Sequence, residues 1–138
     1  MKIVFITDIH IAAEGETPAG IDVRANFLKA LDAVRAMKPK CLVIGGDLCF
    51  DVGVRETYKW IYRQLQNDLP CQWYAIPGNH DYYTGIEAVR AAITGAGATM
   101  MTNEGLVIGD AGAGFALLGL DDLYGPRSDA RSAGPDLD

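Results

Sequence analysis

Basic residues and long hydrophobic runs are scarce in this sequence. Of its 138 residues, 12 are Lys or Arg and 18 are Asp or Glu, which gives a formal net charge of -6. A chain with so little positive charge offers no surface suited to a nucleic-acid backbone, so we expect no nucleic-acid partner. Its apolar runs fall far short of the ~20 residues that a membrane span needs, and its first residues lack the pattern of a secretory signal peptide. We therefore expect a cytoplasmic protein with no membrane span.

Cysteine is also scarce. The three cysteines, Cys41, Cys49 and Cys71, are an odd number and include no closely spaced pair. This usage favours a reducing compartment and buried thiols over a disulfide. Cys49 stands two residues after Asp47, and a neighbouring carboxylate raises the pKa of a thiol. We therefore expect a structural role for Cys49 rather than a role as a nucleophile.

Short apolar runs alternate with amphipathic segments over the first hundred residues. The apolar runs are too short for helices, which indicates strands, whereas the amphipathic segments have helical periodicity. The runs are residues 3–6, 41–44 and 72–76, and the amphipathic segments are 21–37, 54–66 and 86–93. This order predicts an α/β fold with a mostly parallel sheet covered by helices, in which strand 3–6 is buried and residues 11–20 form a loop. Residues 106–108 and 115–118 flank a glycine-rich turn, which predicts an antiparallel hairpin.

Polar side chains follow each of the three predicted strands. They are Asp8 and His10 after the first, Asp47 after the second, and Asn79, His80 and Asp81 after the third. Because the carboxyl ends of parallel strands open on one edge of a sheet, we expect these side chains to meet in one crevice. Each motif alone is more typical of a turn or a helix cap, but the three together, with the only two histidines of the chain, indicate a metal site. Oxygen and imidazole donors suit Mn, Fe or Zn.

Two details of the local geometry follow from the same residues. Asp8 and His10 are two positions apart, so in extended backbone their side chains face the same way and can share a cation. Pro77 and Gly78 force a sharp exit from the third strand, and we expect residues 76–83 to form an active-site loop. Tyr82 and Tyr83 follow this loop and either line the leaving group of a substrate or belong to the core.

A dinucleotide-binding domain is the main alternative interpretation of a chain in which strands and helices alternate. Its Gly-x-Gly-x-x-Gly fingerprint should follow the first strand, where this chain has Thr7-Asp8-Ile9-His10-Ile11-Ala12. The sequence also has no glycine-rich loop ending in Gly-Lys-Ser or Gly-Lys-Thr. These absences exclude both classes of nucleotide-binding site at the expected place.

The series Asp8-Ile9-His10, Gly46-Asp47 and Gly78-Asn79-His80-Asp81 resembles the motifs of the calcineurin-like metallophosphoesterase superfamily. The resemblance covers residues 1–125 and leaves 126–138 as a polar tail that we expect to be exposed or disordered. Residues 22–27 and 46–49 look like the cyclic-nucleotide phosphodiesterase branch. Residues 79–85, 103–104 and 118–122 are closer to the small bacterial phosphodiesterases that include lipid-precursor pyrophosphatases. The implied fold is an α/β/β/α sandwich of mixed sheets, here with an incomplete C-terminal part.

The resemblance also implies roles for the residues of these motifs. Asp8 and His10 would bind a first metal ion, Asp47 would bridge it to a second, and Asn79 would bind the second. His80 would lie beside the leaving group with Asp81 orienting its ring. The implied activity is hydrolysis of a phosphodiester, phosphomonoester or pyrophosphate bond by a hydroxide activated between two Mn, Fe or Zn ions. The substrate would be a nucleotide-like or lipid-precursor-like phosphoester.

The sequence departs from the family after His80. Members complete the site with a further histidine and a Gly-His-x-His motif, whereas this chain has no histidine beyond His80. Three interpretations stay open: a truncated chain, a short form that draws ligands from a second subunit or from Asp121, Asp122 and water, or a catalytically incomplete metal-binding module. Missing strands of the second sheet would expose apolar surface, so a homo-oligomer is a further expectation.

Overall fold

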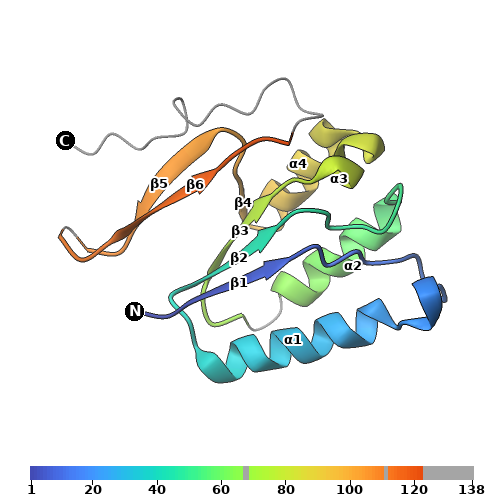
Figure 1. The fold of residues 1–138 in the computed structure, drawn as a ribbon, viewed down its shortest axis with the longest axis horizontal. Coiled ribbons are helices and arrows are strands. Elements are labelled where there is room, and N and C mark those ends of the chain that lie inside the picture. Colours follow the sequence, from blue (N-terminus) through green and yellow to red (C-terminus); the bar gives the residue numbers. More distant parts are fainter. Residues whose placement is uncertain (67–68, 111, 123–138) are drawn as a thin grey trace.

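The computed structural model describes residues 1–66, 69–110 and 112–122, and the statements below refer to these residues. Four parallel strands form the main sheet in the order β1-β2-β3-β4, and β5 and β6 form a separate antiparallel pair (Figure 1). The strands are β1 (Ile3–Thr7), β2 (Cys41–Gly45), β3 (Gln72–Ile76), β4 (Thr99–Met100), β5 (Glu104–Ile108) and β6 (Phe115–Gly119). The helices are the 3-10 turn η1 (Pro18–Gly20), α1 (Val23–Met37), α2 (Arg55–Gln66), α3 (Asn79–Thr84) and α4 (Ile86–Gly95). The predicted α/β fold is confirmed.

The main sheet has one face against helices and the other against the hairpin of β5 and β6. Side chains alternate across a strand, so Leu42 and Ile44 of β2 join the core beneath the helices, whereas Cys41 and Val43 pack with Ile108 of the hairpin. Figure 1 shows α1 and the hairpin on opposite sides of the sheet. Every residue of β2 is buried, which makes β2 the fixed centre from which the site is built.

The expectation that the first strand is buried is wrong for one of its faces. Ile3 and Phe5 of β1 are 43% and 59% exposed. β1 lies at the edge of the sheet, and the hairpin packs against β2 and β3 instead, through residues such as Val43 and Tyr74. The sequence of β1 resembles that of β2 because nothing local distinguishes an edge strand from a central one. Self-association through this surface remains a prediction.

Several predicted boundaries also change. The first long helix begins at Val23 and not at residue 21, because the side chain of Asp22 caps it by accepting a hydrogen bond from the backbone N–H of Ala25 at 2.9 Å. The expected loop 76–83 is largely helical, since α3 begins directly after Gly78. The short strand β4 was not predicted, and the loop 11–20 contains η1. The predicted tail, residues 126–138, lies outside the described residues.

No helix in the described ranges combines the length and the apolar character that crossing a bilayer requires.

The docking of the hairpin can be tested at Gly119, the last residue of β6. A Cβ atom there would lie 2.3 Å from the Cβ of Met101, which cannot move away because it is attached to the main chain. We expect Gly119→Ala to lower the free energy of unfolding by about 1–3 kcal/mol in urea denaturation. Gly95→Ala is the matched control, because Gly95 ends α4 with no atom within 4 Å of its Cβ position. The control should be neutral or slightly stabilising, and equal losses in both variants would contradict this packing.

Candidate metal centre

The backbone beyond the strands holds the predicted site residues at the carboxyl edge of the sheet. The N–H of Asp8 donates to the carbonyl of Gly45 at 2.9 Å, and the N–H of His10 donates to the carbonyl of Asp47 at 3.1 Å. These bonds continue the pairing of β1 with β2 past the last residue of each strand. The loop after β1 therefore lies alongside the loop after β2, as the sequence predicts.

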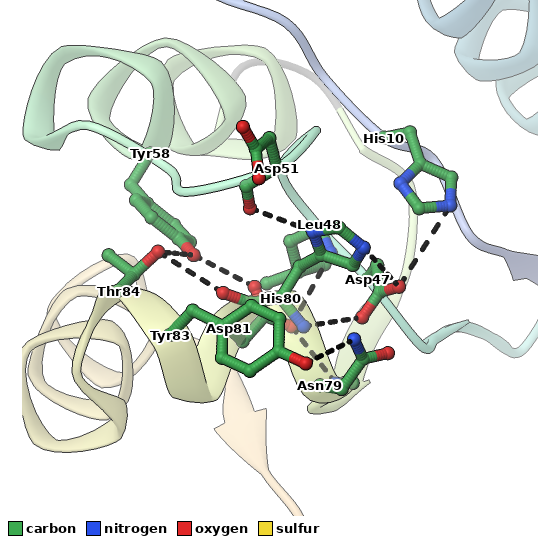
Figure 2. Close-up of polar contacts among 11 residues, drawn as sticks. His10, Asp47, Leu48, Asp51, Tyr58, Asn79, His80, Asp81, Tyr83 and Thr84 are labelled. Carbon is green, nitrogen blue, oxygen red and sulfur yellow. Dashed lines mark hydrogen bonds and ion pairs between the residues drawn. The ribbon is translucent and has the colours of Figure 1, made fainter.

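Two imidazoles face one carboxylate oxygen at this edge. The Nε2 atom of His10 lies 3.9 Å from Oδ2 of Asp47, and the Nε2 atom of His80 lies 3.7 Å from the same oxygen (Figure 2). Both distances exceed those of a hydrogen bond. The candidate ligand atoms of the three residues lie within 4.8 Å of one another, and Asp47 is only 7% exposed. The gap between the imidazole nitrogens and the carboxylate oxygen is wide enough for a cation to lie between them.

The donor set suits a borderline metal ion. The imidazole nitrogen of His10 and the carboxylate oxygen of Asp47 are ligands that Zn, Mn and Fe accept, the imidazole of His80 lies within reach of the same place, and no thiolate takes part. The Nδ1 atom of His10 is buried and has no hydrogen-bond partner among the described residues, so the ring is not committed to a competing protein contact through that nitrogen. The residues present therefore fit a metal ion.

Asp8 and Asn79 lie next to this cluster, which consists of His10, Asp47 and His80, but are not part of it. Asp8 is exposed, and its Oδ1 atom lies 2.8 Å from the position that a Cβ of Gly46 would occupy. The extended backbone expected from Asp8 to His10 is wrong, because their φ angles are 50° and 42°. Asn79 is the first residue of α3 and donates from Nδ2 to the hydroxyl of Tyr83 at a long 3.4 Å. Their roles as ligands remain proposals.

Gly78 allows the third loop to approach Asp47. The Oδ1 atom of Asp47 accepts a hydrogen bond from the backbone N–H of His80 at 3.0 Å. A Cβ atom on Gly78 would lie 2.1 Å from that Oδ1 and 2.6 Å from the backbone nitrogen of Asp47. No other residue fits here without moving one of the two loops. The glycine of the Gly-Asn-His-Asp motif is thus explained by close packing.

Asp81 does not orient the ring of His80, in contrast to the role implied by the resemblance. Its carboxylate is fully buried and accepts hydrogen bonds from the Tyr58 hydroxyl at 2.8 Å and from the backbone N–H groups of Gly78 at 3.1 Å and Leu48 at 3.4 Å. Burial raises the pKa of Asp81, and these hydrogen bonds partly offset that rise. Because the carboxylate points into the protein, it clamps the loops after β2 and β3 together (Figure 2).

The contact that does hold the His80 ring comes from the main chain. The Nδ1 atom of His80 lies 2.9 Å from the carbonyl oxygen of Asp51. A carbonyl only accepts, so this contact places a proton on Nδ1 and leaves Nε2 facing Asp47. Neither Asp51 nor Tyr58 was predicted as part of the site. The contact with Asp51 could not be predicted because every residue has a backbone carbonyl. Tyr58 was not predicted because it fits the apolar stripe of its helix.

The two tyrosines after the motif have different surroundings. Tyr83 is 49% exposed and its ring centroid lies 5.7 Å from that of His80, so it lies at the site. Tyr82 instead donates a hydrogen bond from its hydroxyl to Asp121. Asp121, which was considered as a substitute ligand, is therefore engaged with Tyr82 and lies outside the cluster of His10, Asp47 and His80.

Cys49 is buried completely, and burial raises the pKa of its thiol to about 12. A thiol with so high a pKa is protonated at neutral pH and is a poor nucleophile. These findings agree with the structural role expected for it.

Residues 1–125 match the family model described as calcineurin-like phosphoesterase. A probable cyclic nucleotide phosphodiesterase of Pseudoalteromonas sp. (strain SM9913) is 29% identical over 59% of this chain and 31% of its own length. Another probable cyclic nucleotide phosphodiesterase, from Fibrobacter succinogenes, is 35% identical over 64% of this chain and 34% of its own length. An uncharacterized metallophosphoesterase of Helicobacter pylori is 24% identical over 100% of this chain. The chain spans about a third of the length of these curated relatives.

The central position of Asp47 predicts a loss of metal binding in Asp47→Asn. The substitution keeps the size of the side chain but removes the charge that both imidazoles face, so we expect the bound metal measured by elemental analysis after dialysis against Mn²⁺ to fall to background. Asp32→Asn is the control, because Asp32 is an exposed carboxylate on α1. Unchanged metal content in Asp47→Asn would remove this residue from the metal centre.

The clamp formed by Asp81 predicts a stability defect in Asp81→Asn. An amide places a donor where the carboxylate accepts three hydrogen bonds, so we expect the free energy of unfolding to fall by about 1–3 kcal/mol or more. Tyr58→Phe removes one of the three donors and should cost less. If urea denaturation shows wild-type stability for Asp81→Asn, the clamp is not supported and a role toward His80 should be reconsidered.

Proposed function

Because the chain belongs to the calcineurin-like phosphoesterase family, we propose that it hydrolyses a phosphodiester bond with the help of two metal ions. The observation that carries this proposal is the convergence of the Nε2 atoms of His10 and His80 on Oδ2 of Asp47. Two of the relatives are named as probable cyclic nucleotide phosphodiesterases, which favours a diester over a monoester or a pyrophosphate.

Asp8 and His10 would hold the first ion, Asp47 would bridge, and Asn79 would hold the second. Mn, Fe or Zn bound there supplies Lewis-acid chemistry: it lowers the pKa of water and neutralises the charge that develops on the phosphate. The contribution of Asp47 is position, since its Oδ1 is fixed by the N–H of His80 and its Oδ2 faces the imidazoles. Asp47 is therefore the residue on which both ions would depend.

His80 is suited to act at the leaving group. With the proton of Nδ1 directed at the carbonyl of Asp51, a neutral ring presents a lone pair at Nε2, and a protonated ring presents an N–H donor there. The donor form can stabilise a phosphate oxygen or give a proton to the departing oxygen. In this assignment, His80 lies beside the reacting phosphate and is not a metal ligand.

Tyr83 would contact the remainder of the substrate. Its ring is half exposed and lies beside His80, so a group leaving near His80 would meet an aromatic surface. A nucleobase can stack on such a ring, and the apolar part of a lipid precursor can pack against it. We propose a nucleotide-like substrate first, and a lipid-precursor-like substrate second.

One observation favours a second candidate function. The chain has only two histidines, both already in the cluster, and it spans about a third of the length of its relatives. The alternative is a metal-binding module that does not hydrolyse phosphoesters by itself. Identical subunits do not change this conclusion, because each copy brings the same two histidines.

Hydrolysis of bis(4-nitrophenyl) phosphate by the 138-residue chain with added Mn²⁺ tests the proposal. We expect release of nitrophenolate above an Asp47→Asn blank. His80→Asn should lower kcat by about 10²- to 10⁴-fold with unchanged metal content, as loss of a general acid does.

Two results would contradict parts of this proposal. If a folded and metal-loaded chain releases no nitrophenolate, the metal-binding module is the better description. If His80→Asn loses its metal, His80 is a ligand and its assignment to the leaving group is wrong.

A further inference from the structure

A cavity of about 750 Å³ lies between α2 and α4, away from the metal centre. Small-molecule sites in proteins have volumes of about 300–1,000 Å³, so this cavity is large enough to hold a ligand. A smaller hollow of about 290 Å³ continues along the same two helices and shares Lys59, Tyr62 and Ala92 with it. Figure 2 shows Tyr58 and Thr84, two residues of the cavity wall, on the opposite side of Asp81 from His10.

The two helices contribute different chemistry to the wall. From α4 come small apolar side chains, Ala88, Val89 and Ala92, which leave the space between the helices open. From α2 come two cations, Arg55 and Lys59, which are one helical turn apart. The cavity therefore combines an apolar wall with a local pair of positive charges, in a chain whose formal net charge is -6.

These cations are available to a ligand. The side chain of Arg55 makes no hydrogen bond or ion pair with any of the residues that the structure describes. Lys59 has one ion-pair contact, 3.9 Å to Glu56, and both partners of that contact are well exposed. Exposed pairs of this kind contribute little free energy, so an anion entering the cavity would meet weak competition.

Tyr62 belongs to the walls of both hollows, and its ring adds to their apolar surface. Tyr62 is 7% exposed, and its hydroxyl oxygen is buried with no hydrogen-bond partner among the described residues. Because a water molecule does not reach this oxygen, a ligand in the cavity contacts the ring and not the hydroxyl. The cations of α2 are therefore the polar groups that an anionic ligand would meet.

We propose that the cavity between α2 and α4 binds a small amphiphilic organic anion. Its oxygen atoms meet Arg55 and Lys59, and its apolar body lies against the ring of Tyr62 and the alanine-rich side of α4. The site is separate from the metal centre, and its existence does not depend on the hydrolysis proposed above.

Isothermal titration calorimetry with sodium octanesulfonate, kept below its micelle concentration, tests this proposal. The probe carries an anionic head and an apolar chain, and it is not a phosphoester. We expect saturable binding to one site, with methanesulfonate and 1-octanol each binding at least about tenfold more weakly, because each retains half of the recognised chemistry.

Four variants locate the binding. Ala88→Phe fills the cavity from an exposed position of α4 and should abolish binding, whereas Ala36→Phe on α1 should leave it unchanged. Arg55→Gln should weaken binding about tenfold by removing a charge. Tyr62→Phe is a second control and should leave binding unchanged, because the buried hydroxyl does not reach the cavity.

Two results would overturn the proposal. One is the absence of saturable binding by the wild-type chain. The other is binding that Ala88→Phe and Arg55→Gln leave unchanged, which would mean that the probe adheres to another surface, such as the exposed face of β1.

Discussion

The close approach of Gly78 to Asp47 is the contact on which the rest of the candidate site depends. A Cβ atom on Gly78 would lie 2.1 Å from a carboxylate oxygen of Asp47, so only a glycine lets the loop after β3 lie against the loop after β2. This approach allows the backbone N–H of His80 to fix one oxygen of Asp47. The other oxygen is then directed at the imidazoles of His10 and His80. A single steric condition thus positions a carboxylate and an imidazole together.

The buried carboxylate of Asp81 maintains this arrangement from the side of the core. It accepts hydrogen bonds from Gly78 and Leu48, which belong to the two loops that meet, and from Tyr58 of α2. A buried carboxylate is costly unless its hydrogen bonds are satisfied, and here three donors surround it. The motif Gly-Asn-His-Asp therefore holds residues for two tasks. His80 faces the site and Asn79 lies next to it, whereas Gly78 and Asp81 hold the loops in place.

Much of the fold and the location of the site could be predicted from sequence, because both depend on patterns that extend along the chain. The alternation of apolar and amphipathic segments predicts the parallel sheet, and the rule that ligand residues gather at the carboxyl ends of strands predicts the meeting of His10, Asp47 and His80. The family resemblance, confirmed over residues 1–125, added the proposed roles of these residues. The positions of the residues along the chain do not by themselves predict these roles.

The errors of prediction concern contacts that no local pattern encodes. Phe5 of β1 is exposed because the hairpin packs over other strands, which depends on residues a hundred positions away. The contact of His80 with the carbonyl of Asp51 involves the main chain, and the left-handed backbone of Asp8 and His10 occurs where two loops pair.

The most direct test of the proposed metal centre is the ¹⁵N spectrum of histidine-labelled protein during titration with Zn²⁺, since the chain has only two histidines. The account predicts a large shift of Nε2 of His10 and a concurrent change at His80, both lost in Asp47→Asn. Spectra that saturating Zn²⁺ leaves unchanged, or that change equally in Asp47→Asn, would contradict it.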